Sequence, residues 1–266
     1  ACGELYAEAP GQLESVLLDT TPGPTHVLVG GAEERPAVLL LPGTGSNAAS
    51  WFGEVPHLLE RHRLIIVDIP GEPGMSVDAR LPLGDAHAVP RWLESLREAL
   101  GLTAMALVGN SLGGWASLRY ATTHPQRVLA LALLAPSGLA APRLSFLLRA
   151  LPLMFLGRFG LRQIQRQVLA GVPLPAEARA FTRLVAEHCR PVTEAVPTFD
   201  DEALRRLNGT PLLYVGGEDD RLLATRASAK RLQRLLPNAE VKVLGGVGHV
   251  LLDQGPTLAT FLDASL

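Results

Sequence analysis

The sequence predicts an α/β fold: a mostly parallel central sheet with helices on both faces and a helical cap inserted into it. Short, continuously apolar runs recur along the chain, and such runs are typical of strands buried on both faces. Segments with helical periodicity separate these runs, as expected for a parallel sheet with crossover helices. The 266 residues, 47% hydrophobic and 19% charged, suffice for one large domain with a modest insertion.

The predicted strands follow one another in a regular order. Two β-patterned segments open the fold on either side of a Pro–Gly turn at Thr21-Pro22-Gly23-Pro24. The later apolar runs have the short length that distinguishes buried strands from buried helices. The predicted strands are Leu13–Asp19, Thr25–Val29, Ala37–Leu41, Leu64–Val67, Ala104–Val108, Val128–Leu134, Pro211–Val215 and Glu240–Leu244.

Helices are predicted between these strands from periodicity and from end signals. The helix at Val89–Leu100 has Pro90 in its first turn and Gly101 directly after its end, which are the residue types that favour a helix start and a helix stop. The other predicted helices are Val55–Arg61, Trp115–Thr123, Ala224–Leu236 and Pro256–Leu262.

One stretch breaks the alternation. Between Ser137 and Phe199 no strand is predicted, only helical pieces cut by prolines at positions 152, 173, 175, 191 and 197. We interpret residues 137–199 as a helical cap inserted in a core domain formed by residues 1–136 and 200–266. Such an insertion is expected over the carboxyl ends of the strands, where ligands of α/β proteins bind.

Composition excludes several classes of function. A net charge of −2 gives no electrostatic footprint for nucleic acid, and no uninterrupted apolar run is long enough to predict a membrane span. Cys2 and Cys189 make no disulfide framework, and no Cys/His spacing suits a metal, so we expect neither a metal nor another cofactor. The expected location is cytoplasmic, with a removed lipoprotein signal before Ala1-Cys2-Gly3 as the alternative. The oligomeric state stays open.

The segment Gly109-Asn110-Ser111-Leu112-Gly113 is the main functional signal. It follows a predicted strand and precedes a predicted helix, so Ser111 stands at the tip of a sharp turn. Gly-x-Ser-x-Gly also arises by chance in a chain with 26 glycines, but the strand before it and the helix after it favour a nucleophile elbow. We therefore predict Ser111 as the catalytic nucleophile.

A serine nucleophile needs a positioned base, and the base needs an acid to orient it. His249 is the best candidate for the base among seven histidines, because it lies in the Gly-rich loop 245–249 after the last predicted strand. The loop 216–220 ends another strand and supplies three adjacent acids. We predict Asp220 as the acid, because it falls where the chain turns out of the strand, with Asp219 as the alternative.

The developing oxyanion needs two preorganised donors. We predict the N–H groups of Leu112, at the start of the helix after the elbow, and of Thr44, in the Gly-rich loop 41–47. Phosphate binding by this loop is not favoured, because it lacks the Gly-Lys-Ser/Thr ending of a P-loop.

These motifs together resemble the α/β-hydrolase superfamily, in particular its capped serine esterases, over Leu39–Leu252. The elbow, the turn at residues 68–76 (with one residue more than the family's Asp-x-x-Gly-x-Gly-x-Ser) and the acid and histidine loops carry the resemblance. Two positions depart from it. Pro42 stands where relatives usually carry a histidine, and Val250 follows His249 where many carbon–carbon bond hydrolases have tryptophan.

The predicted activity is cofactor-independent cleavage of a small or medium carboxylic ester through an acyl-enzyme. The alternatives are a carbon–carbon bond hydrolase, a lactonase, a thioesterase, or a ligand-binding signalling protein with slow turnover. The predicted partner is a small ester-like molecule. We expect Trp115 and Asn110 to contact it in a mainly apolar pocket. The cap carries eight arginines against three glutamates, and Arg149 is the candidate to meet a substrate carboxylate, if these arginines are not simply solvated.

Overall fold

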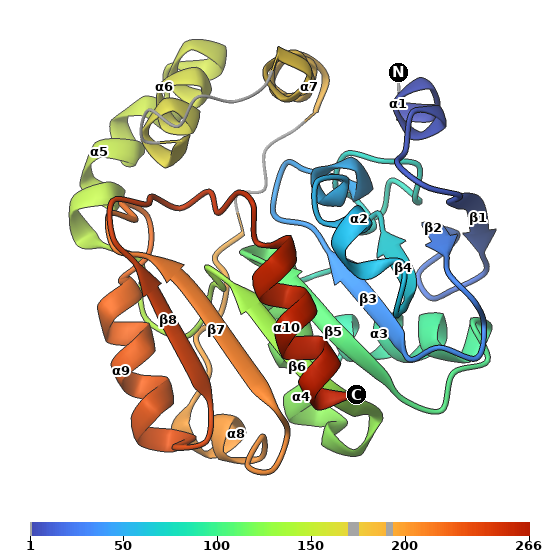
Figure 1. Cartoon of the computed structure of the whole chain (residues 1–266). Helices are drawn as coiled ribbons and strands as arrows, with labels where there is room; N and C mark the ends of the chain where they lie inside the picture. The colour runs from blue at the N-terminus through green and yellow to red at the C-terminus, as the bar shows by residue number, and fades with distance from the viewer. Residues whose placement is uncertain (1, 170–175, 190–193) are drawn as a thin grey trace.

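A computed structural model of the protein describes residues 2–169, 176–189 and 194–266. A single eight-stranded sheet runs through it in the order β1-β2-β4-β3-β5-β6-β7-β8 (Figure 1). β1 and β2 pair antiparallel with each other, β2 pairs antiparallel with β4, and all other neighbours are parallel. The strands are β1 (Glu14–Leu18), β2 (Thr25–Gly30), β3 (Ala37–Leu41), β4 (Arg63–Val67), β5 (Met105–Asn110), β6 (Val128–Leu134), β7 (Leu212–Gly217) and β8 (Glu240–Leu244).

Helices cover both faces of the sheet and create two hydrophobic cores. One core holds the buried side of α3, α4, α8 and α9, and the other holds that of α1, α2 and α10. The helices are α1 (Cys2–Ala7), α2 (Val55–Leu58), α3 (Ala88–Ala99), α4 (Leu112–Thr123), α5 (Leu144–Met154), α6 (Gly157–Leu169), α7 (Ala176–His188), α8 (Asp201–Arg205), α9 (Thr225–Leu235) and α10 (Gly255–Ser265), with short 3₁₀ helices η1 (Ala48–Trp51) and η2 (Pro125–Arg127).

The continuous apolar runs are explained by this two-sided burial. In β3, Leu39 packs into the core under α3 and α4, while its neighbours Val38 and Leu40 pack into the core on the opposite face. All three side chains are fully buried. A strand with one solvent face would alternate apolar and polar residues, whereas a central strand covered on both faces does not. The predicted α/β class with a mostly parallel sheet is therefore confirmed.

The stretch between Ser137 and Phe199 contains α5, α6 and α7, and its described residues include no strand. In Figure 1, α5, α6 and α7 lie beyond the carboxyl ends of the parallel strands, on the side of the sheet from which the loop after β8 emerges. Pro152 lies inside α5, so the prediction that it cuts a helix is wrong; α5 ends two residues later, at Met154. The prolines predicted to interrupt helices at positions 173, 175 and 191 lie outside the described residues.

Of the helices in the described part of the chain, none is long and apolar enough to cross a membrane.

Candidate active site

Ser111 stands between β5 and α4 in a backbone conformation that few residues other than glycine adopt. Its φ is 51° and its ψ is −107°. The crossing around it leaves no room for side chains: a Cβ on Gly109 would lie 2.4 Å from the Gly113 carbonyl oxygen, and one on Gly113 would lie 2.1 Å from that of Leu41. α4 begins at Leu112, directly after the serine and earlier than predicted. The two glycines thus permit the sharp strand-to-helix turn that exposes the Ser111 hydroxyl.

The side chains of Ser111, His249 and Asp220 form one hydrogen-bonded line. His249 Nε2 lies 3.1 Å from Ser111 Oγ, and His249 Nδ1 lies 2.8 Å from Asp220 Oδ2. Asp220 is fully buried and His249 nearly so. These distances let a proton pass from the hydroxyl to the imidazole, with a carboxylate behind the ring to stabilise its charged form.

The loop after β7 holds this line in place in two ways. The backbone N–H groups of Leu222 and Leu223 donate to Asp220 Oδ1 at 2.8 and 2.9 Å, which leaves Oδ2 for His249. The N–H of Asp219 donates to the Val247 carbonyl at 2.8 Å, which fixes the histidine loop against the acid loop. Asp219 itself is exposed, so the structure brings Asp220 and not the alternative Asp219 to the histidine.

The two predicted oxyanion donors lie in segments that flank the serine. Leu112 is the first residue of α4, and the amides of a first helical turn have no partner within their own helix. Thr44 lies in a turn closed by a hydrogen bond from Ser46 N–H to the Gly43 carbonyl. A Cβ on Gly43 would lie 3.4 Å from that of Ser111, so this turn is packed against the elbow.

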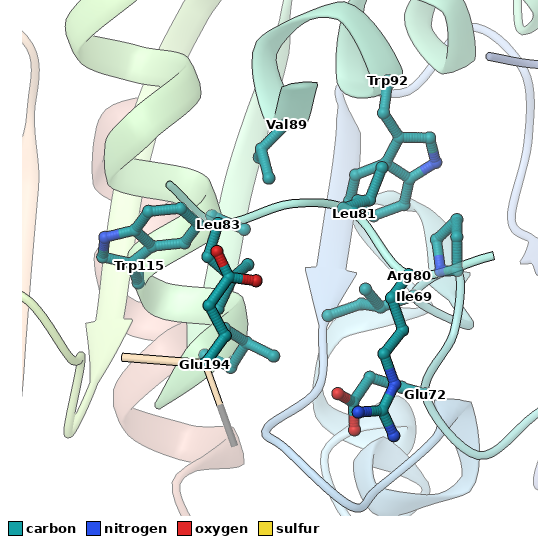
Figure 2. A pocket seen from close by; sticks show the side chains of 12 residues that line it. Ile69, Glu72, Arg80, Leu81, Leu83, Val89, Trp92, Trp115 and Glu194 are labelled. Atoms are coloured by element: carbon teal, nitrogen blue, oxygen red, sulfur yellow. The ribbon is translucent and has the colours of Figure 1, made fainter. Parts of the chain in front are cut away.

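A cavity of about 230 Å³ adjoins the elbow, because Leu112 is among the residues that line it. Figure 2 shows the lining side chains. Its lining is mainly apolar, with three charged side chains, Glu72, Arg80 and Glu194. Burial raises the pKa of the Glu72 carboxyl, and the hydrogen bond from the Gly45 N–H and the charge of Arg80 partly oppose this. The apolar lining residues are Ile69, Pro70, Leu81, Leu83, Val89, Trp92, Leu112, Trp115 and Ala116.

The three predicted substrate-binding residues lie in different places. Trp115 is buried, lines the cavity, and donates its indole N–H to the Pro197 carbonyl at 2.9 Å. Asn110 precedes the serine, and its buried Oδ1 has no hydrogen-bond partner in the described part of the chain. Arg149 is exposed on α5 and is not among the cavity-lining residues. A contact of any of them with substrate stays a prediction.

Sequence reasoning missed the charged lining residues. Glu72 occupies the turn at residues 68–76, and the extra residue in that turn was the available signal. Arg80 and Glu194 come from segments with no motif. Within the described residues no cluster of three or more His, Cys, Asp or Glu side chains could hold a metal ion.

A second Ser–His–Asp line connects the antiparallel strands β1 and β2 with Asp68, the residue that directly follows β4. His26 Nε2 is 2.8 Å from Ser15 Oγ, and His26 Nδ1 is 2.8 Å from Asp68 Oδ2. Asp68 is fully buried and also accepts hydrogen bonds from the Tyr6 hydroxyl and from the N–H groups of Ala48 and Met75. Ser15 is an ordinary strand residue of β1 without an elbow. We interpret this network as structural.

Comparison with known proteins identifies the family of the chain. A model of the family described as alpha/beta hydrolase fold matches residues 36–256, and the chain therefore belongs to the α/β-hydrolase fold family. It is similar to two proteins of Bacillus subtilis (strain 168). It is 26% identical over 257 residues to the uncharacterized carboxylesterase nap, covering 93% of this chain and 84% of that protein. It is 24% identical over 265 residues to carboxylesterase YbfK, covering 93% and 85%.

Solved structures show the same fold. The crystal structure of carboxylesterase CesB (YbfK) from Bacillus subtilis matches with a TM-score of 0.86 at 20% identity, covering 99% of this chain and 94% of that one. A 2-hydroxy-6-oxo-6-phenylhexa-2,4-dienoate hydrolase from Rhodococcus sp. strain RHA1 matches with a TM-score of 0.70 at 24% identity, covering 95% and 100%. The prediction of a hydrolase is confirmed by the family membership together with the similarity to the carboxylesterases.

Proposed function

We propose that the protein is a cofactor-independent serine hydrolase that cleaves small or medium carboxylic esters. The observation that carries this proposal is the hydrogen-bonded line from Ser111 through His249 to Asp220, beside a mainly apolar cavity. Similarity to two carboxylesterases over most of both chains supports the choice of an ester. The proposal includes a helical cap on the core domain, formed by residues 137–199. The position of α5, α6 and α7 beyond the carboxyl ends of the parallel strands supports this cap.

The reaction follows from the geometry. His249 Nδ1–H donates to Asp220, so the neutral Nε2 accepts the Ser111 proton as Oγ attacks the ester carbonyl carbon. The carbonyl oxygen becomes an oxyanion held by the Thr44 and Leu112 N–H groups. When the tetrahedral intermediate collapses, the departing alkoxide takes the proton from His249 and leaves as the alcohol. Water then gives a proton to His249 and attacks the acyl carbon. The second tetrahedral intermediate collapses by breaking the bond between the acyl carbon and Ser111 Oγ, His249 returns its proton to Oγ, and the carboxylic acid is released.

The cavity favours an uncharged, mainly apolar acyl or aryl group. Its volume of about 230 Å³ lies below the usual range of drug-sized ligand sites, which suits a small or medium substrate. Its charged lining holds two carboxylates, Glu72 and Glu194, against one guanidinium, Arg80. A substrate with its own carboxylate, such as a dienoate, would meet net negative charge there. We therefore favour a neutral ester over carbon–carbon bond cleavage in a dienoate.

The test is hydrolysis of a series of nitrophenyl esters of graded acyl length by the wild type and by Ser111→Ala. We expect Ser111→Ala to lose at least about 10³-fold in kcat. A fluorophosphonate probe should label Ser111 in the wild type and leave Ser15 unlabelled, and Ser15→Ala should hydrolyse esters at the native rate. Native turnover by Ser111→Ala would end the proposal. Rapid labelling of Ser111 without turnover of any ester would instead indicate a ligand-binding protein.

A further inference from the structure

The loop that carries Thr44 is held by side chains from outside it. Gly43 to Ser46 form a turn closed by the Ser46 N–H to Gly43 carbonyl bond, and Gly45 lies in the left-handed region with a φ of 70°. A glycine with positive φ at the third position of such a turn is typical of type II. A type I turn would connect the same ends with the Thr44–Gly45 peptide rotated by about half a turn. The orientation of that peptide therefore decides which turn forms.

The Gly45 N–H belongs to this peptide and donates to Glu72 Oε2 at 2.7 Å. Four residues before Glu72, Asp68 Oδ1 accepts the N–H of Ala48 at 2.9 Å. Two carboxylates of one turn, residues 68–76, thus hold the two ends of the segment 45–48. Asp68 is fully buried in the network beneath the sheet edge, whereas Glu72 lines the cavity beside the elbow.

We propose that Glu72 is a positioning residue for ester hydrolysis: by accepting the Gly45 N–H, it fixes the turn that aims the Thr44 N–H at the oxyanion. This inference rests on the proposed function. Glu72 does not touch the reacting atoms in it. Its effect passes through the backbone: Gly45 follows Thr44 in the same four-residue turn, so a hydrogen bond that anchors the Gly45 N–H also holds in place the turn that carries the Thr44 N–H. An oxyanion donor must lie within hydrogen-bonding distance of a charge that appears only during the reaction.

A structural alternative is that Glu72 merely balances the charge of Arg80, whose side chain extends toward it in Figure 2. Two substitutions separate these roles. Glu72→Gln removes the charge but keeps an amide oxygen that can accept the Gly45 N–H. Glu72→Met keeps the length of the side chain and removes the acceptor. Glu60→Met, at an exposed position away from the cavity, controls for the loss of a surface carboxylate.

The experiment measures kcat and KM on one neutral nitrophenyl ester, and Ki for an aryl boronic acid. A boronic acid forms a tetrahedral adduct with a catalytic serine, and its Ki does not depend on the fraction of enzyme that is active. We expect Glu72→Met to lower kcat by about 10- to 100-fold with KM within about threefold, and to weaken Ki by a similar factor. Glu72→Gln should stay within about threefold of the wild type in both, and Glu60→Met should be unchanged.

The inference is overturned if Glu72→Met keeps kcat and Ki within twofold of the wild type while Ser111→Ala is inactive. It is also overturned if Glu72→Gln falls as far as Glu72→Met, because then the charge opposite Arg80 is what matters. Should Glu72→Met fold poorly, Glu72→Ala removes the same acceptor with a smaller side chain, and its Ki decides. Full activity in Ser111→Ala would refute the proposed function itself. This outcome can be told apart from the two results that overturn only the role of Glu72, because in both of those Ser111→Ala is inactive.

Discussion

Replacing Asp220 by asparagine exchanges one carboxylate oxygen for an NH₂ group, and the hydrogen bonds around Asp220 determine which of the two oxygens is exchanged. Two backbone N–H groups, of Leu222 and Leu223, point at Oδ1 at 2.8 and 2.9 Å. The oxygen of the new amide must stay there, because turning the amide over would face its NH₂ group toward two donors. The NH₂ group therefore takes the place of Oδ2, at 2.8 Å from His249 Nδ1.

That placement reverses the histidine tautomer. An NH₂ group beside Nδ1 requires Nδ1 to accept, so the proton moves to Nε2, which then faces Ser111 as a donor and cannot take its proton. The imidazolium also loses the carboxylate that stabilises it. Changes of this kind lower kcat by about 10⁴-fold in serine hydrolases, or about 5 kcal/mol of transition-state stabilisation. We expect a loss of that order in Asp220→Asn, with an unchanged fold.

The assay is the rate of acylation of Ser111 in a single turnover at neutral pH, with circular dichroism and melting temperature as controls for folding. Asp219→Asn is the matched control, because Asp219 is the exposed neighbour that contributes only its backbone to the histidine loop. It should acylate within about twofold of the wild type. If Asp220→Asn acylates within tenfold of the wild type, His249 does not depend on this carboxylate and the proposed proton path is wrong.

Two further predictions concern stability. Gly113→Ala should lower the free energy of unfolding by about 3 kcal/mol or more and abolish activity, because its Cβ would lie 2.1 Å from the Leu41 carbonyl oxygen, whereas Gly53→Ala, with open space around it, should melt near the wild type. Burial raises the pKa of Glu54 to about 7, so the folded state holds this proton more tightly than the unfolded state. The stability that the proton contributes is complete below about pH 4.5 and is lost as the pH rises through about 7. Glu54→Gln should therefore unfold like the wild type at pH 4.5 and be more stable at pH 8, by up to about 3 kcal/mol in urea titrations; an equal difference at both pH values would contradict this, and the exposed Glu60→Gln controls for surface charge.

The strands were predictable because two-sided burial leaves a direct mark on the sequence. The central strands β3 and β6 are buried on both faces at every position except the exposed Leu129 and are apolar throughout, and their predicted and observed bounds coincide. α4 was placed three residues too late, because Leu112, Gly113 and Gly114 are poor indicators of a helix; their place in it depends on the close packing of the elbow against β3. Pro152 was taken as a helix break, yet α5 continues through it for two residues near its end.

Residues of the candidate site could be proposed from sequence where a local motif exists, and not where they meet only through tertiary contacts. Ser111, His249 and Asp220 each stand in a loop directly after a strand, so their sequence context indicated them. The structure brings them within 3.1 and 2.8 Å of one another, over separations of 138 and 29 residues. Arg80 and Glu194 reach the cavity from segments without periodicity or motif. No single-sequence pattern encodes such an approach.

Glu72 lies between these two cases, and it shows how a departure from a motif can be informative. The turn at residues 68–76 has one residue more than the pattern it resembles, which on its own predicts only a local bulge. In the structure both ends of the lengthened turn are held by hydrogen bonds: the Ala48 N–H donates to Asp68 Oδ1, and the Ser76 hydroxyl donates to the Asp68 carbonyl. The extra length is taken up between these fixed ends, where Glu72 reaches the Gly45 N–H. Both anchors of this turn are made without Glu72, so in its proposed role Glu72 acts on the orientation of the loop beside the elbow, and its replacement should lower kcat more than the free energy of unfolding.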